Sequence, residues 1–271
     1  MITFPLISGR IQTQNKAFVM GIVNITSDSF YEQSRGGVER AFRLIDEGAD
    51  ILDLGAESTR PGFTEVPPVQ EEISRLIPVI REIRKKTDIP ISIDTRKKPV
   101  FEACFNEGAD ILNDVSSFDF DSSMAEFCGK NNVPVILTHT YPHGRENDPA
   151  LQNRDLKTLV PELTEFFDKR IALAAFFGLN PERVIIDPGI GFGKTFEENV
   201  ELIKSCGKLC DGKYSVMMAL SRKRVIGQLM GDMQADRLQG TIDADMDAVK
   251  NGAVFLRVHD VHAHIQALQN L

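Results

Sequence analysis

The chain has 271 residues, of which 42% are hydrophobic and 26% charged, and its formal net charge is −8. These proportions are typical of a soluble globular protein with a large core. The acidic balance argues against nucleic-acid binding through a basic surface. No apolar run approaches the roughly 20 residues of a membrane-spanning helix. The start, MITFPLISGRIQTQNK, lacks the pattern of a secretory signal, so we expect a cytoplasmic protein.

Eight short apolar runs recur along the chain, and amphipathic stretches such as PPVQEEISRLIPVIREIRKKT separate most of them. Glycine closes the helix before several runs, as in EGADILDLG from Glu47 and EGADILNDV from Glu107. A run that is apolar without alternation is typical of a strand buried on both faces, and hence of a parallel sheet. The runs span residues 18–26, 50–56, 90–95, 110–117, 134–140, 184–189, 215–221 and 253–260.

Eight repeats of strand and helix predict an α/β fold, a single (β/α)8 TIM barrel that takes up residues 1–271 as one domain. A doubly wound open sheet is the alternative, because it shares the alternation. In a barrel the carboxyl ends of all strands meet at one face, where barrel enzymes place the active site. Polar residues follow every run, so we expect the active site there. They include Asn24, Thr26, Glu57, Thr59, Arg60, Asp94, Asn113, Asp114, His139, Asp187, Ser221, Arg222, Lys223, Arg257, His259 and Asp260.

These polar residues divide into two chemical groups. Asp94, Asn113 and Asp187 are rich in acceptors, and a carboxylate pairs well with the adjacent N–H donors of a guanidine-like heterocycle. The second group is cationic or donating and suits phosphate or diphosphate. It consists of Asn24, Thr59, Arg60, Lys223, Arg257 and His259. The sequence therefore predicts a ligand with a heterocycle at one end and a diphosphate at the other.

The stretch DPGIGFGKT, from Asp187 to Thr195, is close to the phosphate-binding loop of nucleotide-binding proteins. That motif needs a glycine, four residues, Gly-Lys and then Ser or Thr. Gly193, Lys194 and Thr195 supply its end, but Pro188 stands where the first glycine belongs and has no N–H to offer. The spacing therefore argues against a nucleotide switch.

Two clusters have residue types that bind metals. Cys206 and Cys210 are four residues apart, but a closed zinc site needs four convergent ligands, so we interpret them as small residues on a helix. His259, His262 and His264 lie within six residues, yet the last two belong to the closing helix. We predict no structural zinc site.

Seven stretches resemble the dihydropteroate synthase family, and they occur in order from residue 20 to residue 260. They are MGIVNITSDSF (20–30), ESTRPG (57–62), SIDT (92–95), LNDVSS (112–117), IDPGIGFGK (186–194), LSRK (220–223) and RVHD (257–260). The resemblance implies a pterin-binding barrel that joins para-aminobenzoate to 6-hydroxymethyl-7,8-dihydropterin diphosphate and releases pyrophosphate and 7,8-dihydropteroate. It also implies Mg²⁺ as the cofactor and a homodimer.

The same resemblance implies roles for individual residues. Asp94, Asn113 and Asp187 would hold the pterin edge, with Asp94, Asp187 and Lys223 as the catalytic residues. Lys223 and Arg257 would flank the ring, Lys223 would shape the aminobenzoate pocket, and Phe192 would pack beside the aminobenzoate. Mg²⁺ would bind near Asn24. The diphosphate would bind to Asn24, Thr59, Arg60, Arg257 and His259. The DPGIGFGKT stretch would be a barrel loop whose glycines bring the backbone close to a flat ligand.

The sequence departs from the family pattern at several points. The first loop is DSFYEQSRGG (28–37), with Glu32 in place of an aspartate and late glycines. Thr138 and Thr140 replace methionines, and Arg224 replaces a serine where it would either strengthen anion binding or narrow the aminobenzoate pocket. The helix that is normally rich in alanine carries three carboxylates, which we interpret as a solvated face rather than an altered dimer contact. They are Asp243, Asp245 and Asp247.

Two other functions remain open. A domain that presents methyltetrahydrofolate for methyl transfer would share the carboxylate group but would not need the diphosphate group. A non-catalytic pterin-binding paralogue would bind the ligand without releasing pyrophosphate. Two polar residues near the site have plainer interpretations: His139 as a hydrogen-bonding residue at the barrel mouth, and Glu57 as the partner of a neighbouring arginine.

Overall fold

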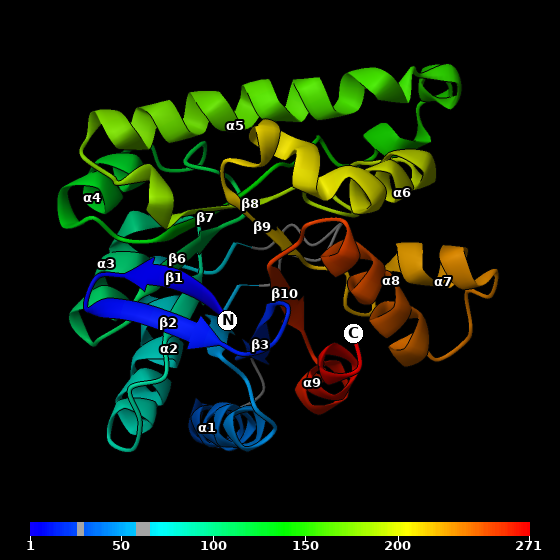
Figure 1. The fold of residues 1–271 in the computed structure, drawn as a ribbon. Coiled ribbons are helices and arrows are strands. Elements are labelled where there is room, and N and C mark those ends of the chain that lie inside the picture. Colours follow the sequence, from blue (N-terminus) through cyan, green and yellow to red (C-terminus); the bar gives the residue numbers. More distant parts are fainter. Residues whose placement is uncertain (26–29, 58–65) are drawn as a thin grey trace.

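The computed structural model describes residues 1–25, 30–57 and 66–271, except for the side chains of 30–35 and 152–153. All eight predicted runs contain a strand, and these strands close into one barrel in the order β10-β3-β4-β5-β6-β7-β8-β9 (Figure 1). Every strand pair in it is parallel, and β10 closes the ring by pairing with both β3 and β9. The predicted (β/α)8 barrel is confirmed, and the open sheet is excluded.

The barrel strands are β3 (Phe18–Asn24), β4 (Ile51–Gly55), β5 (Ile91–Asp94), β6 (Ile111–Asp114), β7 (Val135–Thr138), β8 (Val184–Asp187), β9 (Ser215–Met218) and β10 (Phe255–Val258). The outer helices are α1 (Phe30–Asp46), α2 (Val69–Arg84), α3 (Lys98–Asn106), α4 (Ser123–Asn131), α5 (Leu159–Phe176), α6 (Phe196–Ser205), α7 (Arg224–Met230), α8 (Leu238–Lys250) and α9 (Val261–Gln269). No helix in the described ranges is long and apolar enough to cross a membrane.

The barrel interior changes from apolar to polar along the strands. Successive side chains of a strand point to opposite faces, so residues two apart share the interior. The inward residues near the strand starts form one apolar cluster. They are Phe18, Met20, Ile51, Ile111, Ile136, Ile185, Met217 and Phe255. Two residues further on, five of these strands carry a polar residue. These are Asp53, Asn113, Thr138, Asp187 and Arg257.

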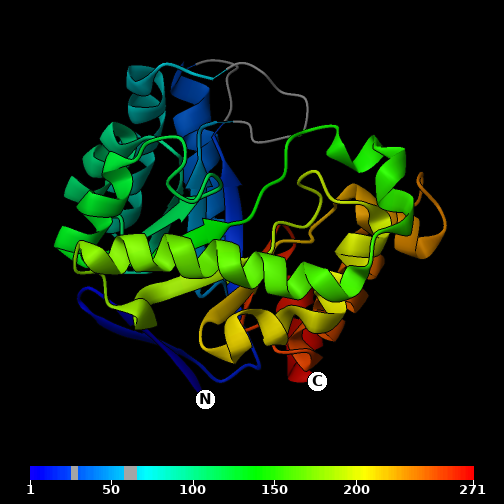
Figure 2. The same cartoon turned by 90° about the horizontal axis from the view of Figure 1, so that it is seen from above.

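A β-hairpin that the sequence analysis did not predict covers the N-terminal end of the barrel. Strand β1 (Ile2–Leu6) pairs antiparallel with β2 (Gly9–Thr13), and Phe4 and Leu6 join the inward apolar cluster. The Phe4 ring meets Phe255 edge to face, with 5.2 Å between ring centroids. Figure 2 shows the hairpin at one end of the barrel and the segment that follows β7 (green) at the other. The hairpin thus closes the apolar end, and the polar end is left for ligands.

Replacing Phe4 with alanine should lower the free energy of unfolding by about 3–5 kcal/mol, because the ring is only 2% exposed and its loss leaves a cavity at the barrel floor. Urea unfolding followed by circular dichroism measures the change. Phe176→Ala is the matched control, since that ring is 82% exposed and should cost far less. Equal losses of unfolding free energy in the two variants would contradict close packing of the hairpin against the barrel.

Candidate functional site

A pocket of about 1780 Å³ opens at the carboxyl ends of the barrel strands. It brings together the predicted ligand-binding residues whose positions are described. They are Asn24, Asp94, Asn113, Asp187, Phe192, Lys223, Arg257 and His259. Asp114, His139 and Asp260, by contrast, do not line it. Thr26, Thr59 and Arg60 lie outside the described residues. Arg224, an exposed residue at the start of α7, also lines the pocket.

Arg257 is the centre of the polar layer inside the barrel. Its Nε donates to Asp53 Oδ2 at 2.6 Å, and its terminal nitrogen donates to Asp94 Oδ2 at 2.8 Å. Asn113 Nδ2 lies 3.3 Å from each carboxylate oxygen of Asp53. Asp53 therefore holds both Arg257 and Asn113 from below. Its second role is electrostatic, because it places a fully buried negative charge beside Asp94.

Sequence reasoning missed Asp53, although a signal was present. Asp53 follows Ile51 by two residues in a strand buried on both faces, so it shares the interior with that residue. A carboxylate in the middle of such a strand is almost never fully buried without a partner. The position therefore called for an inward cation, which Arg257 supplies.

The two predicted carboxylates have raised pKa values. Burial raises the pKa of Asp94 to about 7, although Arg257 opposes the rise and Asp53 adds to it. Burial also raises the pKa of Asp187, which Lys223 opposes, and Asp187 Oδ1 accepts a hydrogen bond from the Gly189 N–H at 2.7 Å. Both groups therefore lie in a site of low polarity beside fixed cations.

Lys223 joins the carboxylate side of the pocket to its aromatic side. Its ammonium donates to the Ile190 carbonyl at 2.7 Å and lies 4.7 Å from the centroid of the Phe192 ring. Burial lowers the pKa of Lys223 to about 8, although Asp187 opposes the fall. The lysine is thus close to its titration point at neutral pH.

His259 is a neutral donor or acceptor at pH 7. Burial and the nearby Arg257 lower its pKa to about 4. Its Nδ1 lies 2.9 Å from Ser221 Oγ, which also accepts from the backbone N–H of His259 at 3.2 Å. Of the group predicted to bind phosphate, Arg257 and Lys223 are therefore the described cations.

The DPGIGFGKT stretch is a barrel loop, and its lysine serves the fold. Lys194 is buried, and its ammonium donates to the carbonyls of His139 and Gly189, each at 3.0 Å. Thr195 caps α6 in a capping box with Glu198. Both side chains are thus engaged within the fold, Lys194 with backbone carbonyls and Thr195 with the start of α6.

The explanation given for two of the loop glycines is wrong. Gly189 has a φ of +69°, and a Cβ there would lie 1.9 Å from the His139 carbonyl oxygen. A Cβ at Gly193 would lie 2.7 Å from the Pro142 carbonyl oxygen. These glycines bring the loop against the backbone that follows β7, rather than against a flat ligand.

Asp245 was predicted on a solvated face, and that prediction is wrong. The carboxylate is fully buried, and its Oδ2 lies 3.0 Å from His264 Nε2. Burial alone would lower the pKa of His264, but Asp245 raises it. The reason is helical spacing: Asp245 lies on the face of α8 that packs against α9, whereas Asp243 and Asp247 are exposed as expected.

The hydrogen bond predicted for His139 at the barrel mouth finds no partner at Nδ1 in the described ranges and stays a prediction for the other ring nitrogen. The ring packs edge to face against Tyr141 and Phe166, with centroid distances of 4.5 and 4.8 Å, and its buried Nδ1 has no partner among the described residues. Burial, with Lys194 nearby, lowers the pKa of His139 to about 3. Glu57 pairs with Arg96, as expected, with 2.5 Å between the two groups.

The structure places the cysteine pair differently from the prediction and the two helical histidines as predicted. Cys206 and Cys210 are buried free thiols, but they lie in a kinked 3-10 segment rather than on one helix, because Cys210 adopts a left-handed conformation. His262 and His264 belong to α9. Within the ranges that the structure describes, no group of three or more His, Cys, Asp or Glu residues could hold a metal ion.

Gly189→Ala should destabilise the protein more than Gly144→Ala. Gly144 has a similar φ of +89° but no atom within 4 Å of an added Cβ, so its variant measures the conformational strain, about 1–2 kcal/mol. The clash at Gly189 should add about 1–3 kcal/mol. Thermal unfolding of the two variants measures the difference, and equal losses would show that the loop can move away from His139.

Comparison with known proteins gives consistent matches over nearly the whole chain. The family model described as pterin binding enzyme matches residues 20–259. The dihydropteroate synthase of Clostridium beijerinckii is 36% identical over 252 residues, which cover 91% of this chain and 90% of the relative. That of Bacillus subtilis is 36% identical over 253 residues, covering 92% and 85%.

Solved structures give the same result. Dihydropteroate synthase from Xanthomonas albilineans, in complex with 7,8-dihydropteroate, matches with a TM-score of 0.83 at 36% identity, covering 97% of this chain and 94% of that one. The Coxiella burnetii dihydropteroate synthase, in complex with pteroic acid, matches with a TM-score of 0.87 at 31% identity, covering 100% and 97%.

Proposed function

The chain belongs to the pterin-binding enzymes and, within them, to the dihydropteroate synthases, and we propose how its own residues divide the work of the family's reaction. It is a transferase that joins para-aminobenzoate to 6-hydroxymethyl-7,8-dihydropterin diphosphate and releases pyrophosphate and 7,8-dihydropteroate. The pocket itself supports this division of roles among the residues. One wall is rich in hydrogen-bond acceptors, and the adjoining wall contains Arg257 and Lys223.

The pterin edge binds to Asp94, Asn113 and Asp187. Two carboxylates and an amide present acceptors on neighbouring strands, which suits the row of N–H donors on a guanidine-like ring. As the methylene loses its diphosphate, positive charge develops on the dihydropterin. Ionised Asp94 and Asp187 stabilise that charge in a site from which burial has removed most of the water. Both act as catalytic residues in this sense.

The diphosphate binds to Arg257 and His259, together with Thr59 and Arg60, which lie outside the described residues. This group of residues favours the synthase over a domain for methyl transfer, because methyltetrahydrofolate carries no diphosphate. Asp53 and Asp94 hold the guanidinium of Arg257 by ion pairs. In this position Arg257 lies between the pterin-binding wall and the diphosphate leaving group.

Mg²⁺ fits this site as an ion that arrives with the substrate. The side chain of Asn24 is exposed at the end of β3, lines the pocket and has no partner in the described ranges. Its amide oxygen is one hard ligand, and Mg²⁺ commonly takes few protein ligands together with phosphate oxygens and water. The ion would supply neutralisation of the charge on the leaving diphosphate.

The aminobenzoate binds beside Phe192 and Lys223. The ring packs beside Phe192, and Lys223 holds that wall through the Ile190 carbonyl. The exposed Arg224 supplies a cation for the carboxylate. The aromatic amine is largely unprotonated at pH 7, so it attacks without a strong general base. We further propose that the chain works as one domain, as a homodimer, in the cytoplasm.

Asp94→Asn should lower kcat/KM at least about a hundredfold, because it removes a charge that stabilises the transition state while keeping the shape of the side chain. Pyrophosphate release from dihydropterin diphosphate, para-aminobenzoate and Mg²⁺ is the measurement, with each component omitted in turn. Release that requires both substrates supports the synthase. Full turnover by Asp94→Asn would contradict the charge role, and dihydropterin binding without release would favour a non-catalytic paralogue.

The pH profile of kcat/KM should be bell-shaped, with its maximum between about pH 7 and pH 8. Asp94 must be ionised, so activity should rise as the pH passes its pKa of about 7. Lys223 must be protonated, so activity should fall as the pH passes its pKa of about 8. Lys223→Arg keeps the charge at higher pH and should remove the alkaline fall. A flat profile from pH 6 to pH 9 would contradict both assignments.

A further inference from the structure

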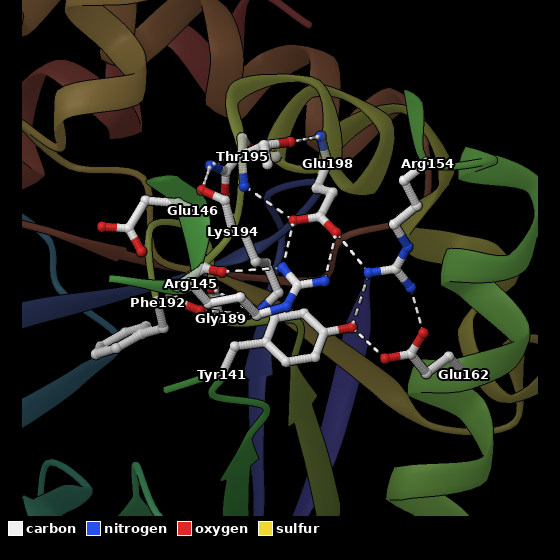
Figure 3. Close-up of polar contacts among 12 residues, drawn as sticks. Tyr141, Arg145, Glu146, Arg154, Glu162, Gly189, Phe192, Lys194, Thr195 and Glu198 are labelled. Carbon is white, nitrogen blue, oxygen red and sulfur yellow. Dashed lines mark hydrogen bonds and ion pairs between the residues drawn. The ribbon is translucent and has the colours of Figure 1, made fainter. Parts of the chain in front are cut away.

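A cluster of charged side chains around the buried Glu198 joins the segment after β7 to the loop after β8, beside the pocket rather than in it. Figure 3 shows this Glu198 cluster, which consists of Tyr141, Arg145, Arg154, Glu162 and Glu198. The first three come from residues 139–158, Glu162 from the start of α5, and Glu198 from the first turn of α6. None of these five side chains lines the pocket.

Glu198 holds the cluster together. Its carboxylate is 1% exposed and accepts a bidentate pair from Arg145, at 2.9 and 3.0 Å. It also accepts from Arg154 at 2.5 Å and from the Thr195 N–H at 2.9 Å. Burial alone would raise the pKa of Glu198, but Arg145 and Thr195 hold it below its ordinary value. The carboxylate is therefore ionised and fully occupied.

Arg145 fastens the segment after β7 to the β8 loop at a second point. One of its terminal nitrogens donates to the Gly193 carbonyl at 3.1 Å, and its guanidinium lies 3.7 Å from the centroid of the Tyr141 ring. The Tyr141 N–H donates to the Phe192 carbonyl at 3.3 Å. On the outer side, Arg154 and the Tyr141 hydroxyl both bind Glu162. The cluster thus fixes residues 189–195 against the neighbouring segment.

The loop fixed in this way forms one wall of the pocket. Its Ile190 carbonyl accepts from Lys223, and its Phe192 ring lies under the same ammonium. Figure 3 shows the Phe192 side chain turned away from the Glu198 cluster. Movement of this loop would therefore shift Phe192 and Lys223 together.

We propose that Glu198 is a positioning residue for the second substrate, para-aminobenzoate. The proposal rests on the proposed function. Bidentate pairing fixes distance and orientation, which apolar packing at this point would not do. Burying these charges costs desolvation energy and makes such a cluster a poor source of stability, so its geometry is the more informative property.

The effect should fall on one substrate. The pterin residues Asp94, Asn113 and Asp187 are the last or next-to-last residues of barrel strands, where ladder hydrogen bonds hold the backbone. The aminobenzoate wall lies on the loop that the Glu198 cluster fixes. Loss of the cluster should therefore weaken aminobenzoate binding and leave pterin binding nearly unchanged.

Glu198→Gln is the first test, because glutamine can keep the capping box of α6 while losing the charge shared with Arg145 and Arg154. We expect the KM for para-aminobenzoate to rise at least about tenfold, since small misplacements at a reacting centre cost factors of ten to a hundred. The KM for dihydropterin diphosphate should change less than about twofold. Glu165→Gln is the matched control on α5, since it breaks an exposed ion pair with Lys169 and should change neither KM.

Arg145→Lys is the second variant and decides the question if Glu198→Gln does not fold. It keeps the positive charge but loses the bidentate geometry, and it should give the same split between the two KM values. Equal rises in both KM values, or an unchanged KM for aminobenzoate, in folded protein would overturn the proposal.

Amide hydrogen exchange separates this proposal from the proposed function. Residues 188–195 should exchange faster in Glu198→Gln than in the wild-type protein, whether or not the wild type turns over. A wild-type protein without turnover would contradict the synthase assignment alone. Unchanged exchange in this loop would overturn the positioning role alone.

Discussion

The placement of Arg257 between Asp53 and Asp94, inside a closed barrel, is the interaction on which the rest of the site depends. Burial alone would lower the pKa of Arg257, but Asp53 and Asp94 raise it above its ordinary value. The arginine in turn limits the rise in the pKa of Asp94. Because each ion makes the burial of the others tolerable, the loss of one would leave uncompensated charge in the interior. The Asp94 carboxylate can therefore be desolvated and still be partly ionised at neutral pH.

The barrel supplies this placement through the alternation of its strands. The same register that puts Phe255 into the apolar layer puts Arg257 two residues higher, and the same holds for Ile51 and Asp53. The N-terminal hairpin completes the apolar layer from below. The apolar cluster beneath the polar layer excludes water from that side. The lower local dielectric strengthens the attraction between Arg257 and the carboxylates of Asp53 and Asp94.

The sequence was sufficient for the fold and for most of the site, because both follow from local patterns. Runs without alternation mark buried parallel strands, and polar strand ends mark the face at which they meet. Two of the misses depend on contacts between different elements of the fold. Asp53 finds its partner 204 residues away, and Asp245 meets His264 across two helices. The hairpin was a different kind of miss. The alternation of Phe4 and Leu6, followed by Gly9 at a turn, is a local pattern, but it lies outside the strand–helix repeat that predicts the barrel.

The two halves of the pocket are held by different kinds of interaction, and this difference limits how each half can change. The wall that we propose for the pterin is held by backbone ladders, which do not depend on which side chains are present. The wall that we propose for the aminobenzoate lies on a loop held by Lys194, Arg145 and Glu198, all of which act through their side chains. Substitutions in those loops can therefore reshape the second wall without disturbing the first. Gly189 and Gly193 belong to this second kind of support, because they admit the neighbouring backbone at distances that no other residue would allow.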